Sequence, residues 1–351
     1  MWRRRKSTDV YYAGFDGGGT RTRCVVSDSD GEVLGTGSAG PSNYHNTGLP
    51  RALASITQAF ELAAERAGLM REERYRLDAC FGLAAMDSTE DFEIMTRGVD
   101  SMRLAPRRGR NIVVNDWRTA MTGAFNDEPG VTLVAGTGCV ASCQSAGGRR
   151  TVRVGGWGNI VDDKGSAYDI GRDALCAAMM DYDTRGPKTE LLRLIMERLK
   201  VDEPQGIIAR VYAEHMEVDE VASISTLVSR AAEGGDAVAL GILNDKGGIL
   251  GELVVTAASL LGLLKTPFGV SLNGGVFNAG EPILNPLRET IRASAPLAKL
   301  VEPKLPPACG GLVLLLRRAG VDVDDRVVSR MALSLKRLSS REEGRSAKDS
   351  A

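Results

Sequence analysis

The sequence has almost no net charge. Its 44 Lys and Arg residues are balanced by 45 Asp and Glu residues, which leaves a formal charge of −1 over 351 residues. Proteins whose main partner is DNA or RNA usually carry a basic patch or stripe. We therefore expect no nucleic-acid partner. Hydrophobic residues at 43% and charged residues at 25% are the proportions of an ordinary soluble protein.

The sequence also lacks a long apolar run near its start. Residues 1–6, Met-Trp-Arg-Arg-Arg-Lys, are basic. No stretch of signal-peptide or membrane-spanning length follows them before the first polar turn. We therefore expect a cytoplasmic protein without a membrane partner.

Cysteine and histidine occur without the spacing of a metal site. The sequence has no C-x-x-C pair, and its histidines are His45 and His215. This argues against a zinc site. We expect the cysteines to be small buried residues in a reducing compartment. They are Cys24, Cys80, Cys139, Cys143, Cys176 and Cys309.

The length and an internal repeat both predict two domains. Single hydrophobic cores tend to stop growing at roughly 250–300 residues. A strand, a Gly-Thr turn and two further strands are predicted over residues 10–36, and the same order recurs over residues 131–154. The repeat predicts a duplicated α/β fold whose two lobes border a central cleft.

The turn of the first repeat is Asp16-Gly17-Gly18-Gly19-Thr20. Glycines let backbone N–H groups approach phosphate oxygens, and the Thr20 hydroxyl can donate another hydrogen bond. Asp16 is a candidate ligand of Mg²⁺, directly or through water, because magnesium favours carboxylates together with substrate phosphates. A plain hairpin turn is the alternative. The turn matches neither the Walker loop nor the Rossmann fingerprint.

The turn of the second repeat is Gly136-Thr137-Gly138. Alone it is a weak signal, because short glycine turns are common. Its equivalent place in the repeat is more informative, since two such turns can bind one polyphosphate from opposite lobes.

Asp116 follows a predicted strand, Asn111-Ile112-Val113-Val114, at its carboxyl end. Open α/β sheets usually bind ligands at that end. A carboxylate there can accept a hydroxyl proton and orient the oxygen for attack on a phosphoryl group. The alternative is that Asp116 caps the helix that begins near Trp117.

The segment from Gly155 to Gly171 combines an aromatic side chain, several carboxylates and several glycines. Trp157 offers an apolar face, while Asp162 and Asp163 can accept hydrogen bonds from sugar hydroxyls. A surface loop leading into a helix near Ser166 is the alternative interpretation.

Motifs in this order resemble a known family. They are Asp-Gly-Gly-Gly-Thr at 16–20, Pro-Ser-Asn at 41–43, Asn-Asp at 115–116, Gly-Thr-Gly-Cys at 136–139, Gly-Gly-Trp-Gly at 155–158, Asp-Lys-Gly-Ser-Ala-Tyr at 163–168 and Gly-Gly-Val at 274–276. The chain resembles the N-acetylglucosamine kinases of the BadF/BadG/BcrA/BcrD ATPase family, in the actin, sugar kinase and Hsp70 superfamily. The similarity extends from about Tyr11 to Gly320.

The resemblance implies roles for particular residues, with ATP and Mg²⁺ as cofactors. Asp116 is implied as the catalytic base that also contacts the sugar. The implied ATP-binding residues are Gly18, Gly19, Thr20, Thr137 and Gly138, with Gly274 and Gly275 on the adenosine side. The other implied sugar-binding residues are Asn43, Cys139, Val140, Gly156, Trp157, Gly158 and Asp163.

The resemblance also implies the architecture, two actin-like lobes of the ribonuclease H type. We expect an N-terminal lobe at 1–117, joined by a C-terminal helix at 323–338, and a larger lobe at 118–322. Residues 339–351 are too polar to bury, and we expect a disordered tail there. We expect the protein to form a homodimer.

The implied reaction is ATP-dependent phosphorylation of a sugar, with N-acetylglucosamine at its 6-hydroxyl as the first candidate. Asp162 and Lys164 stand where the family commonly has Gly and Glu, and Val140 replaces a frequent polar residue. An added carboxylate favours a cationic amino group, so glucosamine is an alternative substrate. Glucose is a further alternative.

Two other functions stay open on the sequence. The first is an ATPase that activates a 2-hydroxyacyl-CoA dehydratase or benzoyl-CoA reductase through an iron–sulfur cluster, which requires thiolates. Cys139, Cys143 and Cys176 keep it open, whereas the sugar-type segment around Trp157 argues against it. The second is a sugar sensor without turnover, against which Asp116 argues.

Overall fold

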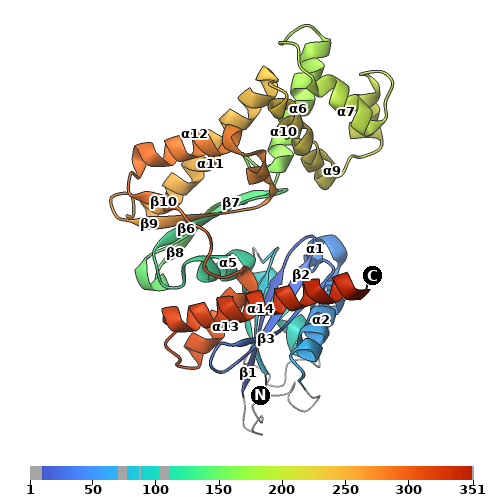
Figure 1. Cartoon of the computed structure of the whole chain (residues 1–351). Coiled ribbons are helices and arrows are strands. Elements are labelled where there is room, and N and C mark those ends of the chain that lie inside the picture. The colour runs from blue at the N-terminus through green and yellow to red at the C-terminus, as the bar shows by residue number, and fades with distance from the viewer. Residues whose placement is uncertain (1–9, 70–76, 87, 103–110, 350–351) are drawn as a thin grey trace. The chain divides into compact units, whose positions relative to one another are not determined.

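The computed structural model describes residues 10–69, 77–86, 88–102 and 111–349, without the side chains beyond residue 340. The chain forms two compact units. Unit 1 comprises Met1–Asp127 and Pro303–Ala351, and unit 2 comprises Glu128–Glu302. Figure 1 shows each unit as a sheet packed with helices.

The described part of unit 1 contains a five-stranded sheet in the order β3-β2-β1-β4-β5. Strands β3, β2 and β1 are antiparallel, and β1, β4 and β5 are parallel. The strands are β1 (Tyr11–Gly17), β2 (Thr22–Asp28), β3 (Val33–Ala39), β4 (Leu77–Leu83) and β5 (Ile112–Asn115). The helices are α1 (Tyr44–Thr47), α2 (Leu49–Arg66), α4 (Thr89–Ser101), α5 (Asp116–Phe125), α13 (Pro307–Arg318) and α14 (Asp325–Asp349).

Apolar side chains on the two faces of this sheet form separate clusters. On one face Phe15 stacks on Phe81 with ring centroids 4.6 Å apart, and Phe60 of α2 joins them. On the other face Tyr12 and Cys80 pack with α13 and α14. A helix on each face therefore buries both sides of β1, which fixes the strand that ends in the first glycine turn.

Unit 2 repeats this sheet, with strand order β10-β9-β6-β7-β8 among its described residues. Strands β6, β7 and β8 are antiparallel, and β6, β9 and β10 are parallel. The strands are β6 (Gly130–Ala135), β7 (Cys139–Gln144), β8 (Thr151–Gly155), β9 (Phe268–Asn273) and β10 (Ala298–Leu300). The matching order confirms the predicted duplicated α/β fold.

Most of the helices of unit 2 lie between β8 and β9 in the chain. In chain order, the helices of unit 2 are η1 (Ala146–Gly148) before β8, then α6 (Ala167–Tyr182), α7 (Leu191–Leu199), α8 (Gly206–Ile208), η2 (Ala209–Ala213), α9 (Val218–Ser223), α10 (Ser225–Glu233) and α11 (Ala237–Leu260) between β8 and β9, and η3 (Gly275–Ala279) and α12 (Glu281–Ser294) after β9. Helices α11 and α12 lie side by side in Figure 1. One apolar cluster joins these helices to the sheet.

The units differ from the expected lobes in their boundaries. They divide at 127/128 and 302/303 rather than at 117/118 and 322/323. Helices α5 and α13 belong to unit 1 because they pack closely on each other. A Cβ at Gly310 of α13 would lie 2.0 Å from the carbonyl oxygen of Thr119. The backbone N–H of Leu305 also donates to the carbonyl oxygen of Gly123.

The end of the chain also differs from the expectation. Helix α14 continues to Asp349, so residues 339–349 of the expected disordered tail are helical, and residues 350–351 lie outside the described residues. In the described part of the chain, no helix combines the length and apolar character needed to span a membrane.

Candidate active site

The carboxyl ends of three parallel strands meet at one edge of the unit 1 sheet. Gly17 of β1 pairs with Leu83 of β4, and Leu83 pairs with Asn115 of β5. Asp116 is the next residue and the first of α5. Two strand spacings separate β5 from β1, which is about 10 Å. The sheet therefore places the predicted base at the same edge as the first glycine turn.

Asn115, rather than Asp116, caps helix α5. Its side-chain oxygen accepts the backbone N–H of Trp117 at 3.3 Å, and its amide nitrogen donates to the carbonyl oxygen of Met86 at 3.1 Å. The alternative in which Asp116 is the cap is therefore wrong. Because Asn115 caps the helix, the half-buried carboxylate of Asp116 does not serve as the helix cap.

The first glycine turn is bonded to the segment that carries Asn43. The carbonyl oxygen of Gly18 accepts the N–H of Ser42 at 3.0 Å and that of Asn43 at 3.2 Å. Gly19 and Thr20 are exposed. Two of the residues predicted to bind ATP thus project from the sheet edge, and Asn43, predicted to bind sugar, lies beside them.

Asp16 lies at the end of β1, and its carboxylate is 22% exposed. Burial raises the pKa of Asp16, and Arg23, 4.0 Å away, lowers it in part. The described residues contain no group of three or more His, Cys, Asp or Glu side chains that could hold a metal alone. One partly buried carboxylate fits Mg²⁺, which keeps waters and takes substrate phosphates as further ligands.

The second glycine turn, in unit 2, is held on two sides. From the first turn of α6, the N–H of Ala167 donates to the carbonyl oxygen of Gly136 at 2.8 Å and that of Tyr168 to Thr137 at 3.4 Å. The hydroxyl of Thr137 donates to Oδ1 of Asp219 at 3.0 Å. Gly274, at the end of the parallel strand β9, has φ 117°, and a Cβ there would lie 2.1 Å from the carbonyl oxygen of Ala135.

A cavity of about 500 Å³ lies within unit 2 at this turn. Ligand pockets for molecules of nucleotide size fall in this range. Gly136, Thr137 and Gly275 line it, as part of a wall that also includes Ala167, Ile170, Asp219, Ala222, Ser223, Ser225, Thr226, Ser229, Leu243, Val276, Asn278 and Ala279. Small side chains from α9 and α10 leave room for a flat ring, and the Gly-Thr turn offers donors to phosphates.

Several of these cavity residues were not predicted from the sequence. Asp219, Ser223, Thr226 and Ser229 belong to α9 and α10, and Asn278 belongs to η3. The spacing of small polar residues from Ser223 to Ser229 was the available signal. The same spacing is found on an ordinary solvent-exposed helix face. The sequence does not tell which face of the helix lies against the second glycine turn.

Trp157 stands on an exposed loop that follows β8, with 69% of its surface exposed. The guanidinium of Arg153 lies over its ring at 5.4 Å and also donates to the carbonyl oxygens of Gly155, at 3.2 Å, and Gly156. This cation–π contact leaves the rest of the indole open to a ligand.

Asp163 is buried at the other end of the same loop. Burial raises its pKa, and the backbone N–H groups of Cys139 and Gly158 lower it in part. Its Oδ1 atom has no hydrogen-bond partner in the part of the chain that the structure describes. A Cβ at Gly138 would lie 2.6 Å from its Oδ2 atom. The carboxylate of Asp163 thus adjoins the second glycine turn, and its Oδ1 atom suits a sugar hydroxyl.

Other predicted sugar-binding residues surround this loop. Cys139 donates from Sγ to the carbonyl oxygen of Lys164 at 3.0 Å. A Cβ at Gly156 would lie 3.1 Å from the Cβ of Val140. Unit 2 therefore brings together Cys139, Val140, Gly156, Trp157, Gly158 and Asp163, whereas Asn43 and Asp116 belong to unit 1.

The cysteines of unit 2 are poor candidates for cluster ligands. Burial raises the pKa of Cys139 well above its usual range, and burial raises the pKa of Cys143 to about 12. Cys176 is exposed on α6, so the expectation that the cysteines are buried is wrong for this residue. Iron–sulfur clusters need thiolates, and raised pKa values disfavour the thiolate.

Two curated proteins are similar to the chain over most of its length. An N-acetylmuramic acid/N-acetylglucosamine kinase of Clostridium acetobutylicum is 32% identical over 305 residues, covering 87% of this chain and 97% of the relative. An N-acetyl-D-glucosamine kinase of Dictyostelium discoideum is 27% identical, covering 87% of this chain and 97% of the relative.

A solved structure and a family model agree with these relatives. The crystal structure of a proposed N-acetylglucosamine kinase of Chromobacterium violaceum matches with a TM-score of 0.68 and 26% identity, covering 88% of this chain and 99% of that one. The model of the BadF/BadG/BcrA/BcrD ATPase family matches residues 13–314. By its strand order, its two glycine turns and these similarities, the chain belongs to the BadF/BadG/BcrA/BcrD ATPase family.

Proposed function

We propose that this protein is an ATP-dependent sugar kinase that transfers the γ-phosphoryl group of ATP to N-acetylglucosamine at its 6-hydroxyl. The observation that carries the proposal is the buried carboxylate of Asp163, whose Oδ1 atom lacks a partner among the described residues. Because it adjoins Gly138 of the phosphate turn, a sugar hydroxyl bound there lies close to bound phosphates. Kinases named for N-acetylglucosamine among the relatives support the same substrate.

The cavity of unit 2 binds ATP in this proposal. Phosphate oxygens accept hydrogen bonds from the turn at Gly136, Thr137 and Gly138, and Gly275 lies on the adenosine side. The Thr137 hydroxyl leaves Asp219 and donates to a phosphate instead. Gly18, Gly19 and Thr20 of unit 1 supply further donors from an exposed turn.

Asp116 is the proposed general base. Its carboxylate accepts the proton of the attacking sugar hydroxyl and orients the oxygen toward the γ-phosphoryl group. Asp16 would hold Mg²⁺ directly or through water. When bound, Mg²⁺ neutralises charge that develops on the phosphate oxygens.

Asp163, Asn43 and Trp157 are the proposed sugar contacts with the clearest chemistry. Asp163 accepts a hydroxyl hydrogen bond, Asn43 can donate and accept, and the indole of Trp157 covers an apolar face of the ring. Lys164 changes the charge of this site less than the sequence suggested, because its Nζ lies 3.5 Å from the buried carboxylate of Asp169. Glucosamine and glucose are competing substrates, since Asp162 adds a carboxylate to the loop.

No observation favours the two alternative functions. The activator ATPase needs thiolates, and burial opposes them at Cys139 and Cys143. A sugar sensor without turnover has no use for the carboxylate that Asp116 places at the edge of the sheet. The homodimer and the cytoplasmic location stay predictions.

Release of ADP from Mg-ATP tests the proposal, with N-acetylglucosamine, N-acetylmuramic acid, glucosamine and glucose as acceptors. We expect sugar-dependent release that is largest with N-acetylglucosamine and absent with its 6-deoxy analogue. The Asp116→Asn variant should lose this release. Asp127→Asn is the matched control, because Asp127 follows the other end of α5 and pairs with Arg317 at 2.7 Å. Release that no sugar stimulates would contradict the proposal.

A further inference from the structure

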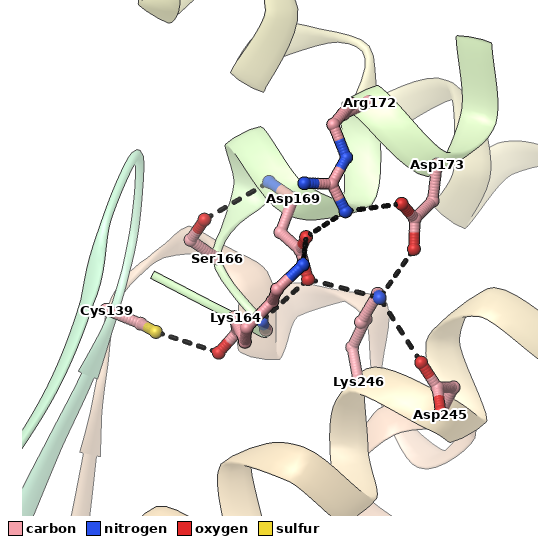
Figure 2. Close-up of polar contacts among 9 residues, drawn as sticks. Cys139, Lys164, Ser166, Asp169, Arg172, Asp173, Asp245 and Lys246 are labelled. Atoms are coloured by element: carbon pink, nitrogen blue, oxygen red, sulfur yellow. Dashed lines mark hydrogen bonds and ion pairs between the residues drawn. The ribbon is translucent and has the colours of Figure 1, made fainter. Parts of the chain in front are cut away.

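An ion pair is buried in unit 2 beneath the loop that carries Asp163. The carboxylate of Asp169, in α6, is 3% exposed, and the ammonium side chain of Lys246, in α11, is 5% exposed. Lys246 Nζ lies 3.1 Å from Oδ2 of Asp169 and 2.5 Å from Oδ2 of Asp173. Figure 2 shows Lys246 reaching from α11 toward both carboxylates of α6.

Both members of this pair keep their charges. Burial by itself raises the pKa of Asp169, but the N–H of Gly165 and the ammonium of Lys246 outweigh it, and the pKa is lowered. Burial by itself lowers the pKa of Lys246, but Asp173 and Asp169 raise it. Buried ion pairs often add little to stability, so their value can lie in the geometry that they impose.

The loop before α6 supplies two of the donors to Asp169. The backbone N–H of Gly165 donates to Oδ2 at 3.0 Å, and Lys164 Nζ lies 3.5 Å from Oδ1. Lys246 contacts the same Oδ2 atom that accepts the N–H of Gly165. The ion pair therefore fixes the oxygen to which the loop backbone is bonded (Figure 2).

This loop adopts a backbone conformation that needs support. Asp163 has φ 49°, which is uncommon for a residue with a side chain, and Gly165 has φ 90°. A Cβ at Gly165 would lie 2.8 Å from Leu250 of α11. The loop thus packs between α11 and β7. On the β7 side, the thiol of Cys139 donates a hydrogen bond to the carbonyl oxygen of Lys164.

We propose that Asp169 and Lys246 are positioning residues that hold the Asp163 carboxylate in place for the sugar. This inference rests on the proposed sugar-kinase function. The chain of contacts runs from Lys246 to Asp169, then to the backbone at Gly165, two residues beyond Asp163. Arg172 supports Asp169 from the other side at 2.7 Å.

The ion pair acts on sugar binding more than on ATP binding. The second glycine turn, which we propose binds phosphate, is held by the backbone N–H groups of Ala167 and Tyr168 and by Asp219. None of these contacts involves the side chain of Asp169. Loosening the loop at Gly165 therefore displaces Asp163 first. A displacement of this kind raises the KM for sugar while the KM for ATP stays close to that of the wild type.

The test is steady-state kinetics on the full chain with Lys246→Met and with Asp169→Asn/Lys246→Met. The double variant removes both charges, so that it folds without an unpaired buried ion. We expect the KM for the sugar to rise about tenfold in both, with a change of less than about threefold for ATP. Lys188→Met is the matched control, because Lys188 pairs at 2.8 Å with Asp181, a buried carboxylate near the other end of α6.

Hydrogen–deuterium exchange of residues 156–166 supplies a readout that does not depend on activity. Exchange in this segment should be faster in both Lys246 variants than in the wild type and in Lys188→Met. A double variant with wild-type sugar KM and wild-type exchange overturns the inference, as does an equal rise in the KM for sugar and for ATP. A wild type without sugar-dependent turnover overturns the proposed function instead, and exchange still reports on the loop.

Discussion

The two glycine turns occupy equivalent places in the two units but are supported differently. In unit 1 the turn follows β1, is bonded through Gly18 to the Asn43 segment, and leaves Thr20 exposed. In unit 2 the turn follows β6, is bonded by the first turn of α6, and has its threonine hydroxyl held by Asp219.

The sheet edges carry different chemistry as well. Unit 1 presents carboxylates at strand ends, Asp16 on β1 and Asp116 after β5. In unit 2, β6 ends at Ala135 and is followed by Gly136, so no carboxylate stands at this strand end. Gly136 lines the cavity instead. A duplicated scaffold has thus become specialised. One copy carries the acids that we propose for proton and metal chemistry, and the other carries the cavity.

The largest expected effect is on the acid chemistry of unit 1. Asp116→Asn should lower kcat by about a thousandfold, because general-base catalysis contributes two to four orders of magnitude. The KM for ATP should hardly change, since the cavity that we propose for ATP lies in unit 2. Stopped ADP-release assays at saturating sugar measure this. If Asp127→Asn lost as much activity, the division of roles between the edges would be wrong.

Gly274→Ala should break the sheet edge of unit 2. Its φ of 117° and the 2.1 Å distance from an added Cβ to the carbonyl oxygen of Ala135 leave no room for a side chain. We expect a loss of about 2–4 kcal/mol in the free energy of unfolding, measured by urea titration. Gly275→Ala is the control, because nothing lies within 4 Å of its added Cβ. Equal stability of the two variants would contradict this account of Gly274.

Asp163→Asn should weaken sugar binding without lowering the free energy of unfolding at neutral pH. The loss of a charged acceptor should raise the sugar KM by about thirtyfold. Burial raises the pKa of Asp163 above its unfolded value, so the ionised carboxylate disfavours the fold.

That pKa shift gives a pH dependence with a definite sign. The wild type keeps its full stability below the ordinary aspartate pKa of about 3.9 and loses some of it as the pH rises through the higher folded pKa. Melting temperatures measured across this range should fall for the wild type relative to Asp163→Asn. The reverse trend would mean that the folded carboxylate is stabilised rather than penalised.

The smallest effect sharpens the comparison of the two turns. Thr137→Val should raise the KM for ATP by about tenfold, because one hydrogen bond to a charged phosphate is lost. Thr20→Val should raise it by about threefold, since its exposed hydroxyl is less ordered beforehand. Steady-state kinetics at saturating sugar measures both. A larger effect at Thr20 would reverse the assignment of the ATP cavity to unit 2.

Local patterns in the sequence were enough to predict β1, β2, β3 and β5 of unit 1 and β6, β7 and β8 of unit 2. The short apolar runs before Asp16 and before Gly136 predicted β1 and β6, and the strand order repeats as expected. The boundaries of the units were less predictable. Helix α5 follows β5 directly, yet it packs on α13, which lies nearly 200 residues later in the chain.

The candidate site also contains residues that the sequence predicted and residues that only the structure identified. Asp163 and Thr137 stand in short motifs that are visible in the sequence, whereas Asp219 and Lys246 are unremarkable residues on helices. Thr137 meets Asp219 across 82 positions of the chain. Similarly, the sequence suggested Asp116 as the alternative cap of α5, and only the hydrogen bond from the backbone N–H of Trp117 identified Asn115 as the cap.

The sequence by itself determined the repeated strands, the glycine turns and the acids that follow them, because these depend on periodicity, backbone freedom and neighbours within a few residues. Only the tertiary structure decided the cavity of unit 2, the Asp163 oxygen that has no partner among the described residues, and the buried pair of Asp169 and Lys246. Those features arise where helices far apart in the chain pack on one sheet, and burial and electrostatic pairing depend on that packing.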